Sequence, residues 1–191
     1  MTTHRMSAFA AAALAGAGLL AAAPGAGAQE ADAAAPTGAP PAQRELVTTA
    51  THGDWDIVCV DGEAPCVMRQ NGVTADGQRA LEMSVRRVEP QQTEQGTVES
   101  VLTIVTPLNV LLRQGLTLQV DAAEPTTGQY TICTNEGCTL TEPAPNVLID
   151  QLKRGAEAKL SFVYVQGQQA GQVDATVSLN GFTAAWNALA P

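Results

Sequence analysis

Apolar and polar residues alternate in short stretches along most of the chain after residue 50. In residues 53–60, GDWDIVCV, the alternation places Trp55, Ile57 and Cys59 on one face, and residues 81–86 follow the same pattern. A period of two is typical of a half-buried β-strand. By the same kind of pattern, further strands are predicted at residues 66–70, 108–112, 116–120, 129–133, 159–165 and 173–179.

Two stretches depart from simple alternation. Residues 97–106, TVESVLTIVT, are nearly continuous in apolar and β-branched residues, which predicts a strand buried on both faces. In residues 146–154, NVLIDQLKR, the apolar residues recur at helical spacing, with Pro145 before them and Gly155 after them. The sequence therefore predicts one short helix at residues 146–154.

Turn signals separate the predicted strands. They include the segment DGEAP at residues 61–65 and the dipeptides Asn71–Gly72 and Asp76–Gly77. Many short strands without regular alternation of strands and helices indicate an all-β domain, a sandwich or a barrel. The closing residues 181–190 predict a final helical turn that packs two aromatic side chains, Phe182 and Trp186, on the core.

The first 28 residues have the pattern of a secretory signal peptide. Arg5 precedes an apolar run at residues 8–23, and Ala26 and Ala28 suit a cleavage site after residue 28. The run is shorter than the roughly 20 residues of a membrane-spanning helix, although a retained membrane anchor is the alternative. Residues 29–46 are rich in Ala and Pro and predict a disordered linker, so the predicted domain covers residues 47–191.

Export and charge narrow the choice of partners. The expected location is the periplasm, with the cell surface or the medium as alternatives, and no membrane-spanning segment is expected after cleavage. The chain carries a net charge of −9, and cleavage would remove only one basic residue and bring it to about −10. Because this charge is repelled by phosphate and the basic residues are scattered, nucleic acid and anionic membranes are disfavoured as partners.

The four cysteines predict disulfides in an oxidising compartment. We favour two local bridges, Cys59–Cys66 and Cys133–Cys138, because each pair flanks a turn-rich segment. A zinc site formed by the four thiolates is the alternative, but the spacing of Cys59 and Cys66 is wider than the usual zinc-binding pair. Neither pair has the spacing of a thiol oxidoreductase motif.

Little in the sequence points to catalysis, and no catalytic residue, metal or cofactor is expected. His52 is the only histidine after residue 28, and the expected position for it is the exposed edge of the domain. Four acids, Asp54, Asp56, Asp61 and Glu63, could bind calcium, although a solvated acidic face is favoured. A hydrolase with paired carboxylates remains an alternative, because acidic residues are plentiful.

Several separate blocks, in order, resemble the invasion-associated locus B family. They are GDWDIVC, CVMRQ, TPLNVLLRQGLTLQVD, the closely spaced Cys133 and Cys138, and VSLNGFTAAWNAL. The resemblance implies a small exported protein of Gram-negative bacteria with an immunoglobulin-like β-sandwich, and it carries over no catalytic residues. It also implies that the four cysteines are structural.

Three functions follow as hypotheses. The favoured one is an exported, non-enzymatic envelope or binding protein with an unidentified protein or envelope partner, and the resemblance adds a role in host-cell invasion or adhesion. The alternatives are a periplasmic hydrolase that uses paired carboxylates and a periplasmic module that binds a small ligand. The sequence sets no oligomeric state.

Overall fold

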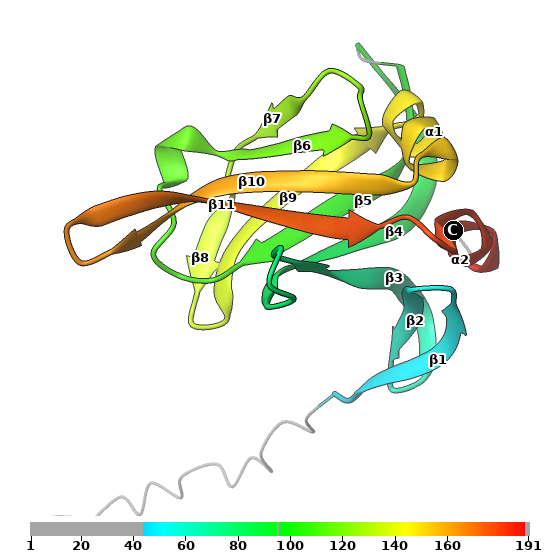
Figure 1. Ribbon diagram of the computed structural model, residues 1–191. Helices are drawn as coiled ribbons and strands as arrows, with labels where there is room; N and C mark the ends of the chain where they lie inside the picture. The colour runs from blue at the N-terminus through cyan, green and yellow to red at the C-terminus, as the bar shows by residue number, and fades with distance from the viewer. Residues whose placement is uncertain (1–43, 95, 190–191) are drawn as a thin grey trace, which may run out of the picture. The chain divides into compact units, whose positions relative to one another are not determined.

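A computed structural model describes residues 44–94 and 96–189, so the predicted signal peptide and most of the predicted linker lie outside the described residues. The domain is mostly β, as the sequence predicts, with two short helices (Figure 1). The strands are β1 (Leu46–His52), β2 (Trp55–Val60), β3 (Glu63–Val73), β4 (Arg79–Thr93), β5 (Gly96–Thr106), β6 (Leu116–Val120), β7 (Thr126–Gly128), β8 (Ile132–Thr134), β9 (Gly137–Pro145), β10 (Glu157–Gln166) and β11 (Gln169–Ser178). The helices are α1 (Asn146–Arg154) and α2 (Phe182–Ala188), and a single 3₁₀ turn covers Leu112–Gln114.

All the strands belong to one antiparallel sheet in the order β7-β6-β10-β11-β3-β4-β5-β9-β8, and β2 and β1 extend it from β3. The weakest joint lies between β11 and β3, which share only the pair Thr176–Val73. The sections on either side of this joint contribute to one apolar core, so the sheet curls into a half-barrel. The strand pairing therefore gives one continuous sheet, whereas the expected immunoglobulin-like sandwich would have two separate sheets.

The two ends of this sheet are joined by the chain itself. β7 and β8 are the end strands, and only residues 129–131 separate them. With only three residues between them, the end of β7 and the start of β8 are at most about 14 Å apart, so the two edges lie close together. Two backbone amides fix this crossing, because Gln129 N donates to Glu142 Oε1 at 3.1 Å and Thr131 N donates to Thr139 O at 2.8 Å.

The core follows from the period-two pattern. In β6 the alternate residues Leu116, Leu118 and Val120 are buried, and the alternate residues of β10 from Ala158 to Phe162 meet them in the same core. Ile149 and Leu152 of α1 and Phe182 and Trp186 of α2 are also buried, whereas Val147, expected on the apolar face of the predicted helix, is 63% exposed. The two helices lie together at one end of the sheet, where Thr183 Oγ1 donates to Lys153 O at 3.1 Å (Figure 1).

Several details differ from the sequence-based predictions. Residues 108–112 are a loop and not a strand: Asn109 adopts a left-handed φ of 68°, and only Val110 forms a bridge, with Tyr164. The first strand begins at Leu46, one residue before the expected start of the domain, and it was not predicted. A mostly apolar run looks like a strand in sequence, whereas pairing partners decide whether it becomes one.

The predicted turn at Asn71–Gly72 is also wrong, because β3 continues through both residues. A Cβ at Gly72 would lie 2.6 Å from Leu81 Cδ1, so glycine is needed there for the close packing of strands. In β5 one face is buried while the other is only half-buried, so the prediction of burial on both faces is wrong for one face. Residues 129–131, expected within a strand, lie between β7 and β8.

In the part of the chain that the structure describes, neither helix is long enough or apolar enough to cross a membrane.

Candidate functional site

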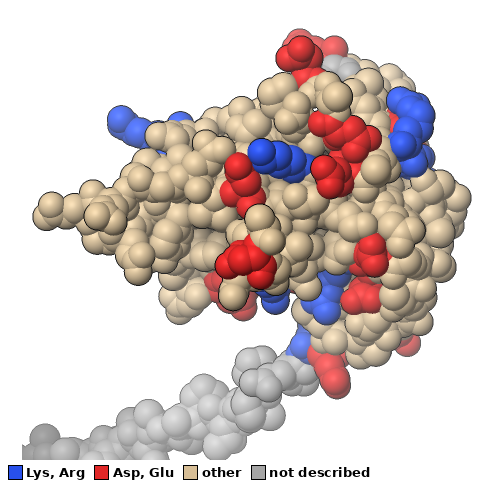
Figure 2. Space-filling view, viewed as in Figure 1, with Lys and Arg blue, Asp and Glu red and all other residues tan. Residues whose placement is uncertain are grey.

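Charged side chains are distributed unevenly over the face shown in Figure 2. Acidic and basic groups alternate over its centre and right, while the projecting left end is almost free of charge. Some of the charges neutralise one another locally, as where Lys159 Nζ lies 3.3 Å from Asp174 Oδ2. The pKa of Asp174 is lowered from its usual value chiefly by the hydrogen bond from Ser161, with Gln172 and Lys159 contributing in the same direction. This cluster is a solvated polar surface with satisfied partners.

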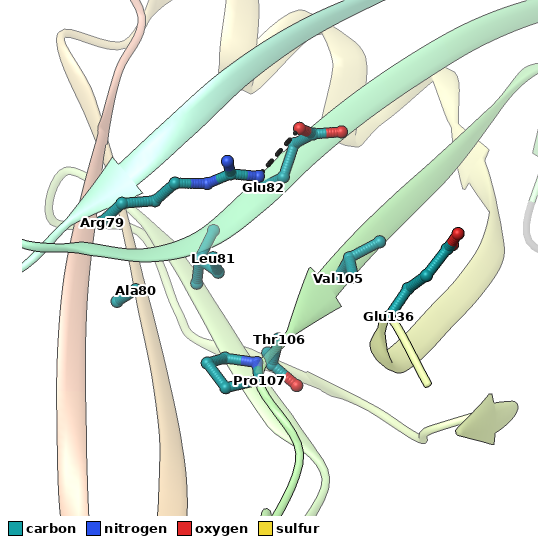
Figure 3. Close-up of a pocket in the computed structure, with 8 residues that line it drawn as sticks. All are labelled: Arg79, Ala80, Leu81, Glu82, Val105, Thr106, Pro107 and Glu136. Atoms are coloured by element: carbon teal, nitrogen blue, oxygen red, sulfur yellow. Dashed lines mark hydrogen bonds and ion pairs between the residues drawn. The ribbon is translucent and has the colours of Figure 1, made fainter. Parts of the chain in front are cut away.

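An open pocket of about 340 Å³ brings together two of the acids that a carboxylate-based hydrolase would need, Glu82 and Glu136 (Figure 3). Glu82 is bound by two guanidinium groups, with Arg79 at 3.1 Å and Arg69 at 3.8 Å. In Figure 3, Val105 stands between the two carboxylates. The pocket is therefore a charged surface groove in which one acid already has cationic partners.

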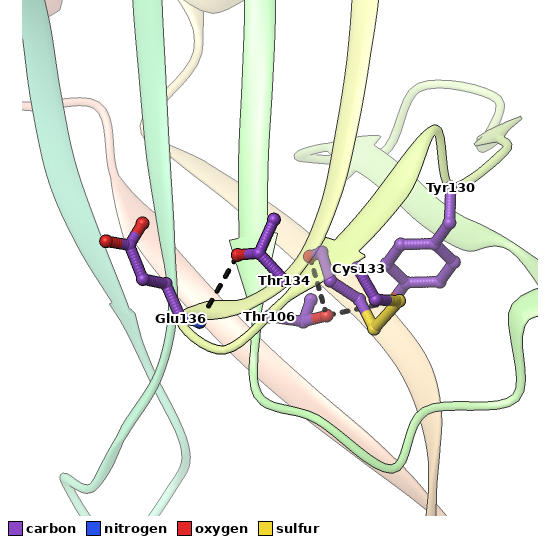
Figure 4. Close-up of a disulfide and its surroundings, with 6 residues drawn as sticks. Thr106, Tyr130, Cys133, Thr134 and Glu136 are labelled. Atoms are coloured by element: carbon purple, nitrogen blue, oxygen red, sulfur yellow. Dashed lines mark hydrogen bonds between the residues drawn. A yellow bond between two sulfur atoms is a disulfide. The ribbon is translucent and has the colours of Figure 1, made fainter. Parts of the chain in front are cut away.

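The structure contains both favoured disulfide bridges. Cys59 and Cys66 are directly opposite residues of β2 and β3, and Cys133 and Cys138 are directly opposite residues of β8 and β9. All four sulfurs are thus bonded in pairs, which leaves no thiolate for the alternative zinc site. Because β8 is only three residues long, the second bridge holds this end strand against the sheet (Figure 4).

Beside the second disulfide lies a buried hydroxyl pair (Figure 4). Thr106 Oγ1 is 3.3 Å from the hydroxyl oxygen of Tyr130 and donates to Cys138 O at 3.2 Å. Burial raises the pKa of the Tyr130 phenol above its ordinary value, and the hydrogen bond with Thr106 opposes that shift. The pair ties the end of β5 to the crossing between β7 and β8, so two segments that carry exposed loops are held together.

We call the surface formed by residues 107–115, 129–137 and 165–171 the loop end. The first segment is fixed to β10 by hydrogen bonds from Leu111 N to Val163 O at 2.9 Å and from Val165 N to Asn109 O at 2.7 Å. Within the loop end only Arg113 and Glu136 are charged. Four large apolar side chains are exposed there: Leu108 by 44%, Leu111 by 36%, Leu112 by 48% and Ile132 by 59%.

Such a concentration of apolar surface on a braced, uncharged end is typical of an interaction site. Sequence reasoning missed it because residues 108–112 were expected to be a strand. The signal that could have revealed it is the low charge of the three segments, which are far apart in the sequence.

Three of the residues singled out as possible site residues, His52, Asp54 and Asp56, make contacts within the fold. His52 is half-buried in β1 and not exposed as expected, and its carbonyl lies against Gly181. Asp54 accepts hydrogen bonds from Ser178 Oγ at 2.6 Å and Asn180 Nδ2 at 3.4 Å, while Asp56 accepts one from Thr51 Oγ1 at 2.7 Å. Among the described residues no three His, Cys, Asp or Glu side chains gather closely enough to hold a metal ion.

A more enclosed cavity of about 220 Å³ lies between β1, β2, β3, β4 and the end of α2. Two adjacent arginines, Arg86 and Arg87, line it together with apolar residues. None of the described residues that line it is acidic. The sequence did not indicate this cavity, because its walls come from five separate elements.

The fold and these features define a small, disulfide-bonded β domain made from one curled antiparallel sheet. A family model described as invasion associated locus B (IalB) protein matches residues 55–190, and the chain belongs to this family. A comparison with curated proteins gives no significant match.

Among solved structures, the crystal structure of invasion associated protein B from Bartonella henselae is similar to this chain. The two share 25% sequence identity with a TM-score of 0.58, and the match covers 75% of this chain and 95% of the Bartonella chain. The resemblance inferred from the sequence blocks is thereby confirmed at the level of the family.

Proposed function

We propose that this chain is an exported, non-enzymatic binding protein of the Gram-negative envelope, and that it binds a protein partner through the loop end. The observation that carries the proposal is the set of four exposed apolar side chains on an end that is braced by a disulfide and almost uncharged. Isolated apolar residues on a surface are ordinary, but four of them on two of the joined segments offer the apolar surface that protein interfaces use.

Export is supported by the signal-peptide pattern of residues 1–28 and by two disulfides, which persist in oxidising compartments. The names of the family and of the Bartonella protein refer to invasion. Adhesion to a host cell is therefore one setting in which the loop end would act, and contact with another envelope protein is the other.

The test compares a loop-end variant with a matched control. Leu108→Ser, Leu111→Ser and Leu112→Ser are combined in one protein, and the control is Val147→Ser, because Val147 of α1 is 63% exposed and lies outside the loop end. Saturable binding is measured to envelope preparations of the source bacterium and, separately, to host-cell surfaces. We expect wild type and the control to bind one of them, and the triple variant to bind about tenfold more weakly.

The proposal fails if the triple variant binds as wild type does, or if wild type binds neither preparation. Cell fractionation with and without residues 1–28 tests export separately. Retention of the full chain in the cytoplasm would contradict that part of the proposal.

A further inference from the structure

The cavity between β1, β2, β3, β4 and the end of α2 has a lining that suits an amphipathic ligand. Its apolar walls come from four residues of different elements: Ala50, Ile57, Pro65 and Leu189. Its volume of about 220 Å³ is below the roughly 300–1,000 Å³ of sites for drug-sized ligands. Only a small molecule would therefore fit without rearrangement of the walls.

The charge of this cavity is unusual for this protein. The whole chain has nearly twice as many acidic as basic residues, yet the described residues that line this space include two arginines and no acid. The side chain of Arg86 forms no ion pair or hydrogen bond with any described residue. No described group therefore compensates its positive charge.

The charge of Arg87 is only partly compensated. Its Nη1 donates to Leu189 O at 3.3 Å, and its Nη2 lies 3.7 Å from Glu99 Oε2, which is longer than a hydrogen bond. Its Nε is buried and has no hydrogen-bond partner among the described residues, and its guanidinium lies 5.2 Å from the centre of the Trp186 ring. An anion in the cavity would offset this charge.

We propose that this cavity binds a small organic carboxylate, with its charged group near Arg86 and Arg87 and a short apolar tail against Ile57, Pro65 and Leu189. A guanidinium group is planar and matches a carboxylate through paired hydrogen bonds. Inorganic phosphate would satisfy the arginines but would leave the apolar walls without a partner. A neutral alcohol of the same length would contact the apolar walls but would leave the charge of the arginines uncompensated.

The proposal is independent of the loop end. The two sites use different elements, since the loop end comprises residues 107–115, 129–137 and 165–171 and none of these lines the cavity. A loop-end variant should consequently keep the carboxylate site, and a cavity variant should keep protein binding.

The first experiment titrates octanoate into the purified protein and follows binding by calorimetry and by tryptophan fluorescence. Trp186 is a suitable reporter because it contacts Arg87. Octanol, octylammonium and inorganic phosphate serve as comparisons. We expect saturable binding of octanoate, weakened by added salt, and binding at least about tenfold weaker for each comparison molecule. Equal binding of octanol, or no binding of octanoate, would overturn the proposal.

Three variants locate the binding. Arg86→Gln removes one charge without breaking a described contact, and Ala50→Leu fills space at the wall. Arg113→Gln is the control, because Arg113 is an arginine of the loop end with no described ion pair. We expect octanoate to bind about tenfold more weakly to each of the first two and unchanged to the third. Thermal unfolding confirms that each variant is folded, and unchanged binding by both cavity variants would contradict the assignment.

Discussion

The indole Nε1 of Trp55 donates a hydrogen bond of 2.9 Å to the backbone carbonyl of Ser178, 123 residues further along the chain. The same tryptophan packs edge-on against Phe182, with the ring centroids 5.0 Å apart. Two of the sequence blocks that carry the family resemblance, GDWDIVC and VSLNGF, are therefore in direct contact in the fold. Their shared role is to join β2 to the end of β11 and the start of α2.

Replacement of Trp55 by phenylalanine should destabilise the domain. The change leaves the Ser178 carbonyl without its donor and removes part of a completely buried side chain. We expect the free energy of unfolding to fall by about 2–4 kcal/mol, measured by urea denaturation. The exposed Val147→Ala variant is the control, and a loss at Trp55 no larger than in that control would contradict the structural role of the hydrogen bond.

Gly181 should tolerate alanine much less well than Gly167 does. Both have left-handed backbones, with φ of 87° and 62°, but a Cβ at Gly181 would lie 2.0 Å from the carbonyl oxygen of His52 while one at Gly167 would meet nothing within 4 Å. Gly167→Ala should therefore cost only the backbone strain, about 1–2 kcal/mol. Gly181→Ala should cost clearly more by thermal unfolding, and equal losses would show that the close approach to His52 is unimportant.

Removal of the disulfide between Cys133 and Cys138 should lower the free energy of unfolding and weaken binding through the loop end. The bridge closes a short loop with a sequence separation of 5, for which chain entropy gives about 2 kcal/mol. The double serine variant should lose about that much by denaturant unfolding and should also lose binding at the loop end. The matched variant at Cys59 and Cys66 should lose similar stability but keep loop-end binding. Loss of loop-end binding in this variant, with binding retained after loss of the Cys133–Cys138 bridge, would contradict the role of that bridge in holding the loop end.

The decline of the melting temperature at alkaline pH should depend on Tyr130. Its pKa in the folded protein is raised by burial, so the unfolded chain loses the phenolic proton first as pH rises. The buried neutral phenol therefore contributes its full stabilisation below the ordinary pKa of about 10. This contribution is lost as pH rises through the raised pKa of Tyr130 in the folded protein. We expect Tyr130→Phe to flatten the alkaline decline in melting temperature, and Tyr164→Phe is the control. An unchanged decline in the Tyr130 variant would contradict the assignment.

The local elements were well predicted because their signals are local. The helix at residues 146–154 has helical spacing and suitable ends, and it begins and ends where the sequence indicates. The final helical turn is also confirmed as α2, with Phe182 and Trp186 buried. In contrast, residues 108–112 are mostly apolar like a buried strand, but they form a loop in which only Val110 makes a bridge and Asn109 is left-handed.

By itself, the sequence determined the mostly β class, the helix, most of the strands and the family, because each depends on periodicity or on residues close together in the chain. Only the tertiary structure decided that the strands form one curled sheet, that three distant segments make an apolar end, and that Arg86 and Arg87 line a cavity without an acid. The physical reason is that strand pairing and cavities depend on contacts between residues far apart in sequence, and the pattern along one strand does not specify its neighbour.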